Sequence, residues 1–185
     1  MSSIDRRALL TAGGALAAVI GTRASGGAAA PPAAAGPTLT PAFSARITVG
    51  KPIELGTVNG VRKRIIPIAG GSFSGERISG TVLPGGADWQ FVRPDGVADL
   101  TARYTIQASD GTPISVSNSG LRRGPPEVMR RIAEGQDVDP ALYYFRASAR
   151  FEVGPGPHQW LADSIFLCTG GRHRDHVELH FFEVG

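Results

Sequence analysis

The sequence predicts an all-β protein, a single antiparallel β-barrel of about eight or nine strands with one short helix. Three observations lead to this prediction. Runs in which apolar and polar residues alternate recur along most of the chain, and this period of two is typical of half-buried strands. Asp95-Gly96 and Asp110-Gly111 stand between such runs, as the tight turns of hairpins do. The 25 glycines and 14 prolines in 185 residues favour turns and strands over helices.

Residues 1–30 are predicted to be a leader that resembles a twin-arginine export signal. Arg6 and Arg7 precede an apolar run that ends at Ile20, and a row of small residues that ends at Ala30 offers a cleavage site. The apolar run has about 13 residues, fewer than the roughly 20 that a membrane-spanning helix needs. We therefore expect the export machinery as a partner, a periplasmic or secreted location, and no stable membrane anchor.

Residues 31–41 are rich in proline and alanine and are predicted to form an extended linker, which leaves residues 42–185 as the barrel domain. The formal net charge of +3 falls to about +1 without the leader, and no basic face with interleaved aromatic residues is evident. Nucleic acid is therefore not an expected partner. The single cysteine, Cys168, lies among apolar residues and is expected to be buried rather than reactive.

The barrel domain is predicted to begin with a strand at Phe43–Val49, followed by a hairpin turn at Asn59-Gly60 and a strand at Val61–Ile68. Pro67 indicates an edge or a bulge in that strand, because proline donates no ladder hydrogen bond. The glycine-rich run at 69–75 is followed by a strand-like run, not by the Lys-Ser/Thr and helix of a phosphate-binding loop. It is therefore interpreted as a turn or a bulge.

One helix interrupts the predicted strands. The segment Pro125–Gly135 begins with proline, has an acidic residue in its first turn and ends with glycine. The other predicted strands are Ile78–Leu83, Asp88–Val92, Ala98–Ala108, Pro113–Ser117, Leu142–Glu152, Trp160–Thr169 and His176–Val184. Closing such strands into a barrel removes the sheet edges, and about eight strands can enclose one small ligand. A sandwich of two sheets is the alternative fold.

Three segments carry a resemblance to a known family: IAGGSFSGERISGTVLPGGADWQFVRPDGVADLTARY, then YYFRASARFEVG, then WLADSIF. In this order they resemble the bacterial and fungal proteins of the domain of unknown function 3237, from about Ile47 to Val184. The resemblance implies a small antiparallel β-barrel with a central pocket, and it implies no particular reaction. Ala162 departs from the family pattern, which often has asparagine after Trp-Leu, and this removes one polar group that a pocket could use.

Six residues are candidates for binding a ligand in such a pocket. In the predicted strand Ala98–Ala108, alternation places Arg103 on the polar face. In the predicted strand Leu142–Glu152, it places Tyr144, Arg146 and Glu152 together on one face. With two residues expected at the rim, the candidates are Asp88, Trp89, Arg103, Tyr144, Arg146 and Glu152. Arginine can hold a carboxylate or enolate oxygen with two hydrogen bonds, and tyrosine or a buried glutamate can move protons. The alternative is that these polar faces simply lie outside the barrel.

No metal site and no cofactor are predicted. His173, His176 and His180 are close in sequence, but residues 176 and 180 of one strand lie about 13 Å apart and cannot share an ion without a bend. Arg172 and Arg174, on either side of His173, also oppose a cation. No Gly-x-Ser-x-Gly elbow is present, which argues against an α/β-hydrolase.

Three functions remain open from the sequence. The leading hypothesis is an exported barrel that binds a small ligand, mostly apolar or bearing a carboxylate or enolate group. The second is a pocket enzyme for proton transfer, such as an isomerase, a dehydratase or a cyclase. The third is a structural or partner-binding domain with a filled interior, against which an open pocket would count.

Overall fold

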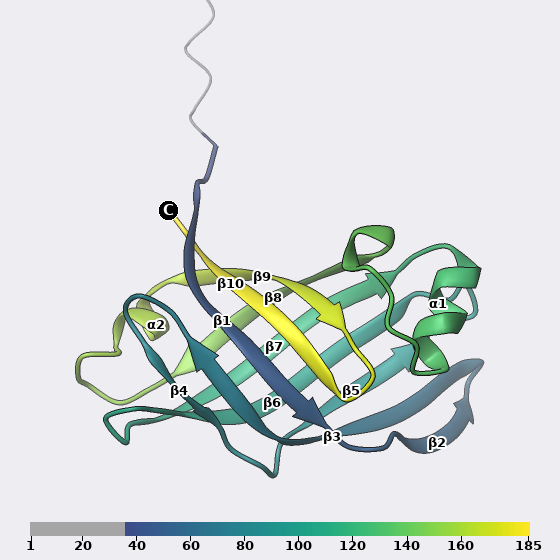
Figure 1. Cartoon of the computed structure of the whole chain (residues 1–185), viewed down its shortest axis with the longest axis horizontal. Coiled ribbons are helices and arrows are strands. Elements are labelled where there is room, and N and C mark those ends of the chain that lie inside the picture. Colours follow the sequence, from purple (N-terminus) through teal and green to yellow (C-terminus); the bar gives the residue numbers. More distant parts are fainter. Residues whose placement is uncertain (1–35) are drawn as a thin grey trace, which may run out of the picture. The chain divides into compact units, whose positions relative to one another are not determined.

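The chain closes into an eight-stranded antiparallel barrel with two additional strands, as the computed structural model of residues 36–185 shows (Figure 1). The strands are β1 (Leu39–Val49), β2 (Ile53–Val58), β3 (Val61–Ser74), β4 (Ser79–Val82), β5 (Ala87–Val92), β6 (Ala98–Ala108), β7 (Pro113–Arg123), β8 (Tyr144–Glu152), β9 (Ile165–Arg172) and β10 (His176–Val184). The helices are α1 (Pro126–Ala133), the one-turn α2 (Trp160–Asp163) and the 3-10 turn η1 (Pro140–Leu142). The all-β prediction with one barrel is confirmed.

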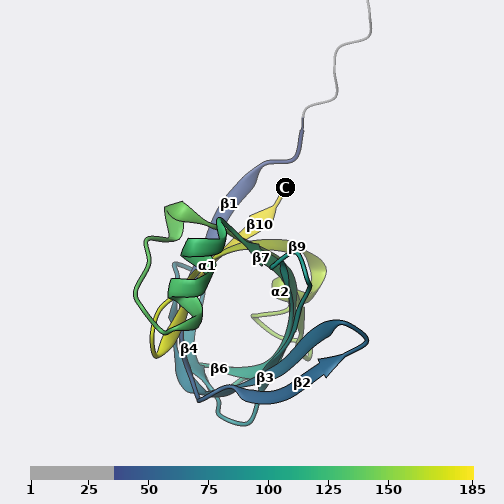
Figure 2. The same ribbon diagram turned by 90° about the vertical axis from the view of Figure 1, so that its right-hand side faces the viewer.

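The strands pair in the order β1-β10-β9-β8-β7-β6-β4-β3, and β3 pairs back with β1 to close the ring. Figure 2 shows this ring, with α1 at the end nearer the viewer. Both β4 and β5 bridge β3 and β6, one after the other, so they share one place in the barrel. β2 pairs only with the first half of β3 and forms an outlying hairpin. Because all the described strands belong to one sheet, the two-sheet sandwich does not apply.

The predicted turns occur where the sequence places them. Asn59 and Gly60 take φ angles of 52° and 77°, which let β2 and β3 meet with Val58 opposite Val61. The glycine-rich run does not turn the chain but continues β3, and the pairing of β3 with β1 shifts register beside it. A side chain at Gly71 would overlap the carbonyl oxygen of Arg46, so the two backbones approach closely only because this residue is glycine.

Several element boundaries differ from the prediction, among them the end of β3 at Ser74 instead of Ile68 and the end of β9 at Arg172 instead of Thr169. β1 begins at Leu39, inside the predicted linker, because Leu39 pairs with Val184 and the backbone of Thr38 bonds that of Gly185. The predicted strand at Trp160–Thr169 opens with α2 instead. A strand sends consecutive side chains to opposite faces, whereas the helical turn lets Trp160 and Leu161 both pack against the core. The helix prediction near residue 126 is confirmed, and β7 runs six residues beyond the predicted Ser117 to Arg123.

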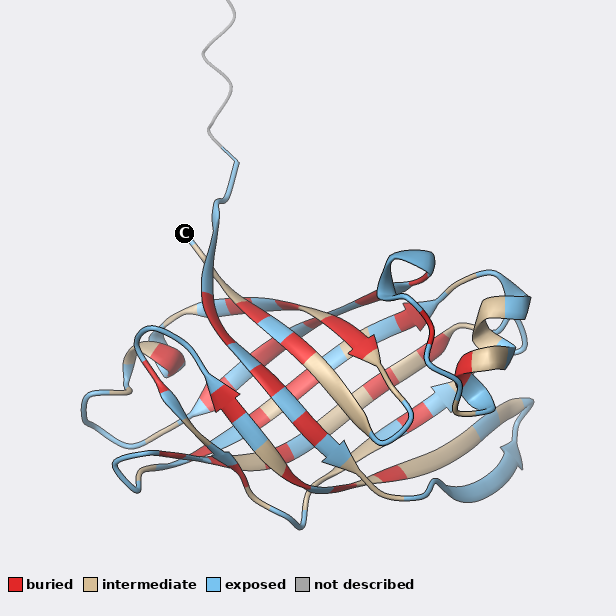
Figure 3. Ribbon diagram, viewed as in Figure 1, coloured by how far each residue is buried: buried red, intermediate tan, exposed pale blue. Residues whose placement is uncertain are grey.

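Buried and exposed residues alternate along the strands of the ring, so that one face of these strands lines the interior, whereas β2 is exposed at all of its positions (Figure 3). The predicted leader, residues 1–30, and the first part of the predicted linker lie outside the described residues. Within residues 36–185, no helix is both long and apolar enough to cross a membrane.

The interior is divided into an aromatic end and a polar end. At the α2 end a chain of aromatic contacts fills it, with ring centroids 4.5–5.9 Å apart between neighbouring rings of the set Phe43, Phe73, Phe151, Trp160, Phe166 and Phe181. Phe166 and Phe181 are almost completely buried. The α1 end carries smaller apolar residues and several charged ones. Aromatic side chains therefore fill the α2 end of the interior in the described barrel.

Candidate functional site

A cavity of ≈ 50 Å³ lies inside the barrel toward α1. Its volume is several times the roughly 10–15 Å³ that accommodates one water molecule. Most of its wall is apolar, with Ile47, Ile68, Leu100, Ala147 and Leu179 among the contributors. The polar side chains on its border are Asp88, Gln90, Tyr104, Asn118, Arg122 and Arg172. An apolar wall with a few polar groups at one end is the usual construction of a small-molecule site.

Four of these polar residues, together with Arg64 from the adjoining space beside α1, form what we call the arginine mouth: Arg64, Asp88, Gln90, Arg122 and Arg172. Strand parity brings them inside. On β7, Ile114 and Val116 are buried in the barrel, and Arg122 continues the same face six residues beyond Val116. On β3, Arg64 lies on the same inward face as Ile66 and Ile68. On β9, Arg172 lies on the same inward face as Phe166. The mouth is thus built by strands whose inward face changes from apolar to charged at one end.

Asp88 is held by a short chain of hydrogen bonds. Gln90 donates from Nε2 to Asp88 Oδ2 at 2.5 Å, and the backbone N–H of Thr101 donates to Oδ1 at 3.1 Å. Arg64 in turn donates from Nε to Gln90 Oε1 at 2.9 Å. Burial raises the pKa of Asp88, although these hydrogen bonds and the guanidinium of Arg122 act in the opposite direction. This carboxyl group therefore takes up a proton at a higher pH than an exposed aspartate.

Arg122 is a buried cation with an unused donor. Its side chain is 3% exposed, and its Nε has no hydrogen-bond partner within residues 36–185. Its guanidinium lies 5.9 Å from the centre of the Phe145 ring. Burial, and then repulsion by Arg64, lower the pKa of Arg122 to about 10, and attraction by Asp88 offsets only part of this. A buried cation is stable only when other groups compensate its charge. Asp88 compensates the charge of Arg122 only in part, and Nε lacks a hydrogen-bond acceptor.

The mouth as a whole carries excess positive charge. It contains the guanidinium groups of Arg64, Arg122 and Arg172 but only one carboxylate, that of Asp88. The mouth continues into a space of ≈ 190 Å³ beside α1, which Arg174 also borders. Glu134 of α1 borders this space as well, but its carboxylate is paired with Arg130 at 2.6 Å. An anion is therefore the ligand that the electrostatics of the mouth favour.

Arg172 is fixed in the mouth by its own hairpin. Its Nη1 donates to the backbone carbonyl of His173 and, at 3.0 Å, to that of His176. Its backbone N–H donates to the Tyr143 hydroxyl at 2.7 Å. Burial lowers the pKa of Arg172, and repulsion by Arg64 adds to the effect. The mouth thus presents at least one guanidinium whose position is set before any ligand arrives.

The six candidates from the sequence are not brought together. Asp88 borders the cavity, as expected of a rim residue. The side chains of Trp89, Arg103, Tyr144, Arg146 and Glu152 are exposed on the outer face of the barrel, where the alternative interpretation places them. On β8 the inward positions are the apolar ones, Phe145, Ala147, Ala149 and Phe151. Arg146 instead donates to the carbonyl of Phe145 and lies over the Tyr144 ring.

Sequence reasoning missed Arg64, Gln90, Arg122 and Arg172. A parity signal for Arg122 is present: Ile114, Val116 and Arg122 are all even-numbered positions of one strand, but the predicted strand stopped at Ser117. No such signal exists on β5, because Trp89 and Phe91 face outward while Asp88 and Gln90 face inward, the reverse of the usual pattern. A prediction from hydrophobicity alone would place Trp89 and Phe91 on the inward face of β5, whereas they lie on its outward face.

Cys168 is buried, as predicted, and is 1% exposed. The amide of Asn118 donates to its sulfur at 3.4 Å. Burial raises the pKa of the thiol to about 11, so the reactive thiolate is scarce at neutral pH. The described geometry gives Cys168 a structural role.

The fold and the cavity define a class of protein, the small antiparallel β-barrel with a pocket at one end. Comparison with known proteins gives the family. Residues 37–184 match the family model described as protein of unknown function (DUF3237), and the chain belongs to this family.

The relatives match this chain over nearly all of their own length and leave about a fifth of this chain uncovered. A UPF0311 protein of Clostridium acetobutylicum is 43% identical over 143 residues, which cover 77% of this chain and 90% of the relative. The crystal structure of a conserved protein of unknown function from Rhodopseudomonas palustris has 38% identity and a TM-score of 0.80, and covers 82% of this chain and 99% of that one. A β-barrel-like protein of Acinetobacter baumannii has 32% identity and a TM-score of 0.72, with coverage of 82% and 98%.

Proposed function

We propose that the protein binds a small organic anion, whose charged head meets Arg122 in the arginine mouth and whose apolar end enters the cavity. The observation that carries this proposal is the buried guanidinium of Arg122 with its unpartnered Nε. A carboxylate, an enolate or a similar oxyanion would supply both the missing acceptor and the missing charge. Hydrogen bonds to charged groups contribute about 1.5–3 kcal/mol, which corresponds to roughly 10- to 150-fold in affinity.

The shape of the site supports a ligand of this kind. The aromatic end closes the barrel, so a ligand has to enter beside α1 and pass the three arginines. The cavity beyond them is small and mostly apolar. The charged head therefore stays in the mouth, and the apolar remainder has to be short.

The test uses the full-length protein and a panel of short aliphatic and aromatic carboxylates in isothermal titration calorimetry. We expect at least one carboxylate to bind with a Kd below about 1 mM and the Arg122→Met variant to lose at least about tenfold in affinity. Arg103→Met is the matched control, because Arg103 lies on the outer face and should leave binding unchanged. Equal binding by Arg122→Met and wild type would contradict the proposal, as would the absence of any binding.

Asp88 favours a second candidate function, proton transfer on the bound anion. A carboxyl group with a raised pKa close to a guanidinium that can hold an oxyanion is a combination that enzymes use for enolisation and related steps. Arg122 would hold the developing oxyanion, and Asp88 would accept or return the proton.

This enzymatic candidate is tested by NMR in D₂O with a carboxylate that binds. Protein-dependent exchange of a carbon-bound hydrogen, lost in Asp88→Asn while binding is kept, would support an enzyme. Binding without exchange, in wild type and variant alike, would favour a binding protein over an enzyme.

Export is the remaining part of the proposal, and it rests on the leader pattern around Arg6 and Arg7. In a bacterial host, the full chain is expected in the periplasm in a shortened form, and a variant with both arginines changed to lysine is expected to stay in the cytoplasm at full length. Equal fractionation of the two forms would contradict a twin-arginine route.

A further inference from the structure

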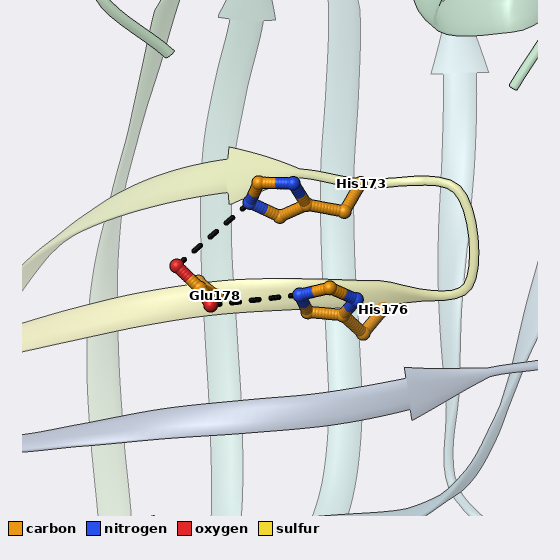
Figure 4. Close-up of side chains that lie close together, drawn as sticks. All are labelled: His173, His176 and Glu178. Carbon is orange, nitrogen blue, oxygen red and sulfur yellow. Dashed lines mark ion pairs between the residues drawn. The ribbon is translucent and has the colours of Figure 1, made fainter. Parts of the chain in front are cut away.

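The turn between β9 and β10 brings three metal-binding side chains together on the outside of the barrel (Figure 4). The backbone N–H of His173 donates to the carbonyl of His176 at 2.9 Å and closes the turn. The two imidazole rings stack with centroids 4.5 Å apart and planes within 10° of parallel. Glu178, two residues further along β10, points to the same side. The pair that matters is therefore His173 and His176, not the more distant His176 and His180.

The distances between the donor atoms suit one metal ion. His173 Nε2 lies 3.8 Å from Glu178 Oε2, and His176 Nε2 lies 3.5 Å from Glu178 Oε1. The three donor atoms all lie within 4.8 Å of one another. Two ligands of a tetrahedral zinc ion, each about 2.1 Å from the metal, are roughly 3.4 Å apart. The donor atoms that lie furthest apart would have to approach by up to about 1.4 Å, and the stacked rings would have to tilt, so that both Nε2 lone pairs point to a single ion.

Both imidazoles are already oriented by carboxylates on their other nitrogens. His173 Nδ1 lies 3.4 Å from Asp137 Oδ1, and His176 Nδ1 lies 2.6 Å from Asp175 Oδ1. Metal-binding histidines usually donate this second nitrogen to a carboxylate, which fixes the ring and leaves the Nε2 lone pair for the metal. His173 Nε2 is shielded from solvent and has no hydrogen-bond partner within the described barrel. An ion between the rings and Glu178 would satisfy it.

The local charge also suits a cation. The carboxylates of Asp137, Asp175 and Glu178 contact the two histidines, against the guanidinium of Arg46 at 3.1 Å from His176 Nδ1. The arginines that flank His173 in sequence face elsewhere. Arg172 is bonded to backbone carbonyls, and Arg174 borders the space beside α1. Of the two sequence-based objections to a metal, the one that relied on these two arginines does not apply to the folded turn, and the distance between His176 and His180 does not concern the pair His173 and His176.

We propose that His173 Nε2, His176 Nε2 and the Glu178 carboxylate form a binding site for a divalent transition-metal ion of the zinc type. Two imidazoles and a carboxylate are a ligand set that zinc accepts, and they leave a coordination position for water or another ligand. The site lies on the outer face and shares no side chain with the anion site in the mouth, although Arg172 of the mouth bonds the backbone carbonyls of His173 and His176.

The test is metal binding by untagged full-length protein after treatment with EDTA. Zn²⁺ affinity is measured by competition with a chromophoric chelator, and Co²⁺ is added separately to record its visible absorption. We expect one ion per chain with a Kd in the micromolar range or tighter, and a cobalt spectrum of four- or five-coordinate intensity. A Kd above about 1 mM for Zn²⁺ would overturn the proposal.

Variants locate the ion. His176→Ala and the milder Glu178→Gln are each expected to weaken Zn²⁺ binding at least about tenfold, and Asp137→Asn to weaken it by roughly tenfold or more through the orientation of His173. His180→Ala is the matched control, since this histidine shares β10 but bonds Ser44 at 2.8 Å. If His180→Ala weakens binding as much as the two ligand variants, or if none of them does, the ion binds elsewhere and the proposal is wrong. Circular dichroism confirms that each variant is folded.

Discussion

Replacing Arg122 by methionine is expected to stabilise the ligand-free protein while it abolishes anion binding. Burial lowers the pKa of Arg122 from its ordinary value to about 10. Because one pKa unit corresponds to about 1.4 kcal/mol, the buried charge costs the folded state about 3 kcal/mol. Methionine has a similar length and no charge, but Asp88 loses an attractive partner in the exchange. We therefore expect a net gain of about 1–3 kcal/mol in the free energy of unfolding.

The dependence of this gain on pH follows from the direction of the shift. Near neutrality Arg122 is protonated in both the folded and the unfolded chain, so its full cost is present. The cost declines only when the pH rises above about 10, where the folded protein begins to lose the proton before the unfolded chain does. The contribution of the Arg122 proton to the difference in stability should therefore be the same at pH 6 and pH 8, and a change between these pH values would report Asp88, whose pKa Arg122 lowers.

Urea unfolding of the two full-length proteins at pH 7, without added anions, measures this difference. For a domain of this size each kcal/mol raises Tm by roughly 2–4 °C, so thermal unfolding gives a second reading. Arg103→Met, on the outer face, should stay within about 0.5 kcal/mol of wild type. A loss of stability in Arg122→Met would refute the reasoning, because it would mean that the guanidinium is fully satisfied without a ligand.

Three further predictions concern the mouth, the bulge and the aromatic end. The affinity for a small sulfonate, whose charge is constant, should rise as the pH is lowered from 8 to 5. The reason is that Asp88 has a raised pKa and that its protonation removes a competing negative charge. Calorimetry should show this rise in the wild type and no such rise in Asp88→Asn. Gly71→Ala should lower the free energy of unfolding by more than about 2 kcal/mol, whereas Gly111→Ala, with free space around it, should cost about 1 kcal/mol, both read from urea midpoints. Phe166→Ala should cost about 3–5 kcal/mol and, by opening the filled end, strengthen the binding of carboxylates with longer apolar tails relative to short ones.

The fold could be predicted from local signals because those signals are strong in this chain. Asn59-Gly60, Asp95-Gly96 and Asp110-Gly111 mark real turns, and alternation marks real strands. The errors fall where tertiary contacts override local pattern. Trp160 and Leu161 form a helical turn because both reach the core, and Leu39 joins a strand because the far end of the chain supplies its partner.

The site was harder to predict, because it depends on which face of each strand points inward. Arg146 and Arg122 are both charged residues within barrel strands. In the barrel they lie on opposite sides of the wall, since Phe145 takes the inward place on β8 whereas Val116 sets the inward parity of β7. Only Asp88 was both predicted and found at the cavity. The pairing of strands that are distant in sequence, not composition, therefore decides which of these side chains point into the barrel.

The pairing of Thr38 with Gly185 makes the described chain an almost unbroken loop. Each of these residues donates its backbone N–H to the other, at 2.9 and 3.0 Å, beside the aromatic end. A short peptide joining them would allow the chain to be cut instead at Asn59-Gly60, a circular permutation that keeps every strand pair of the ring. Any sequence fused ahead of Thr38 or after Gly185 would leave the barrel at the end away from the arginines, so dyes or surface tethers placed there should not obstruct the approach of a ligand.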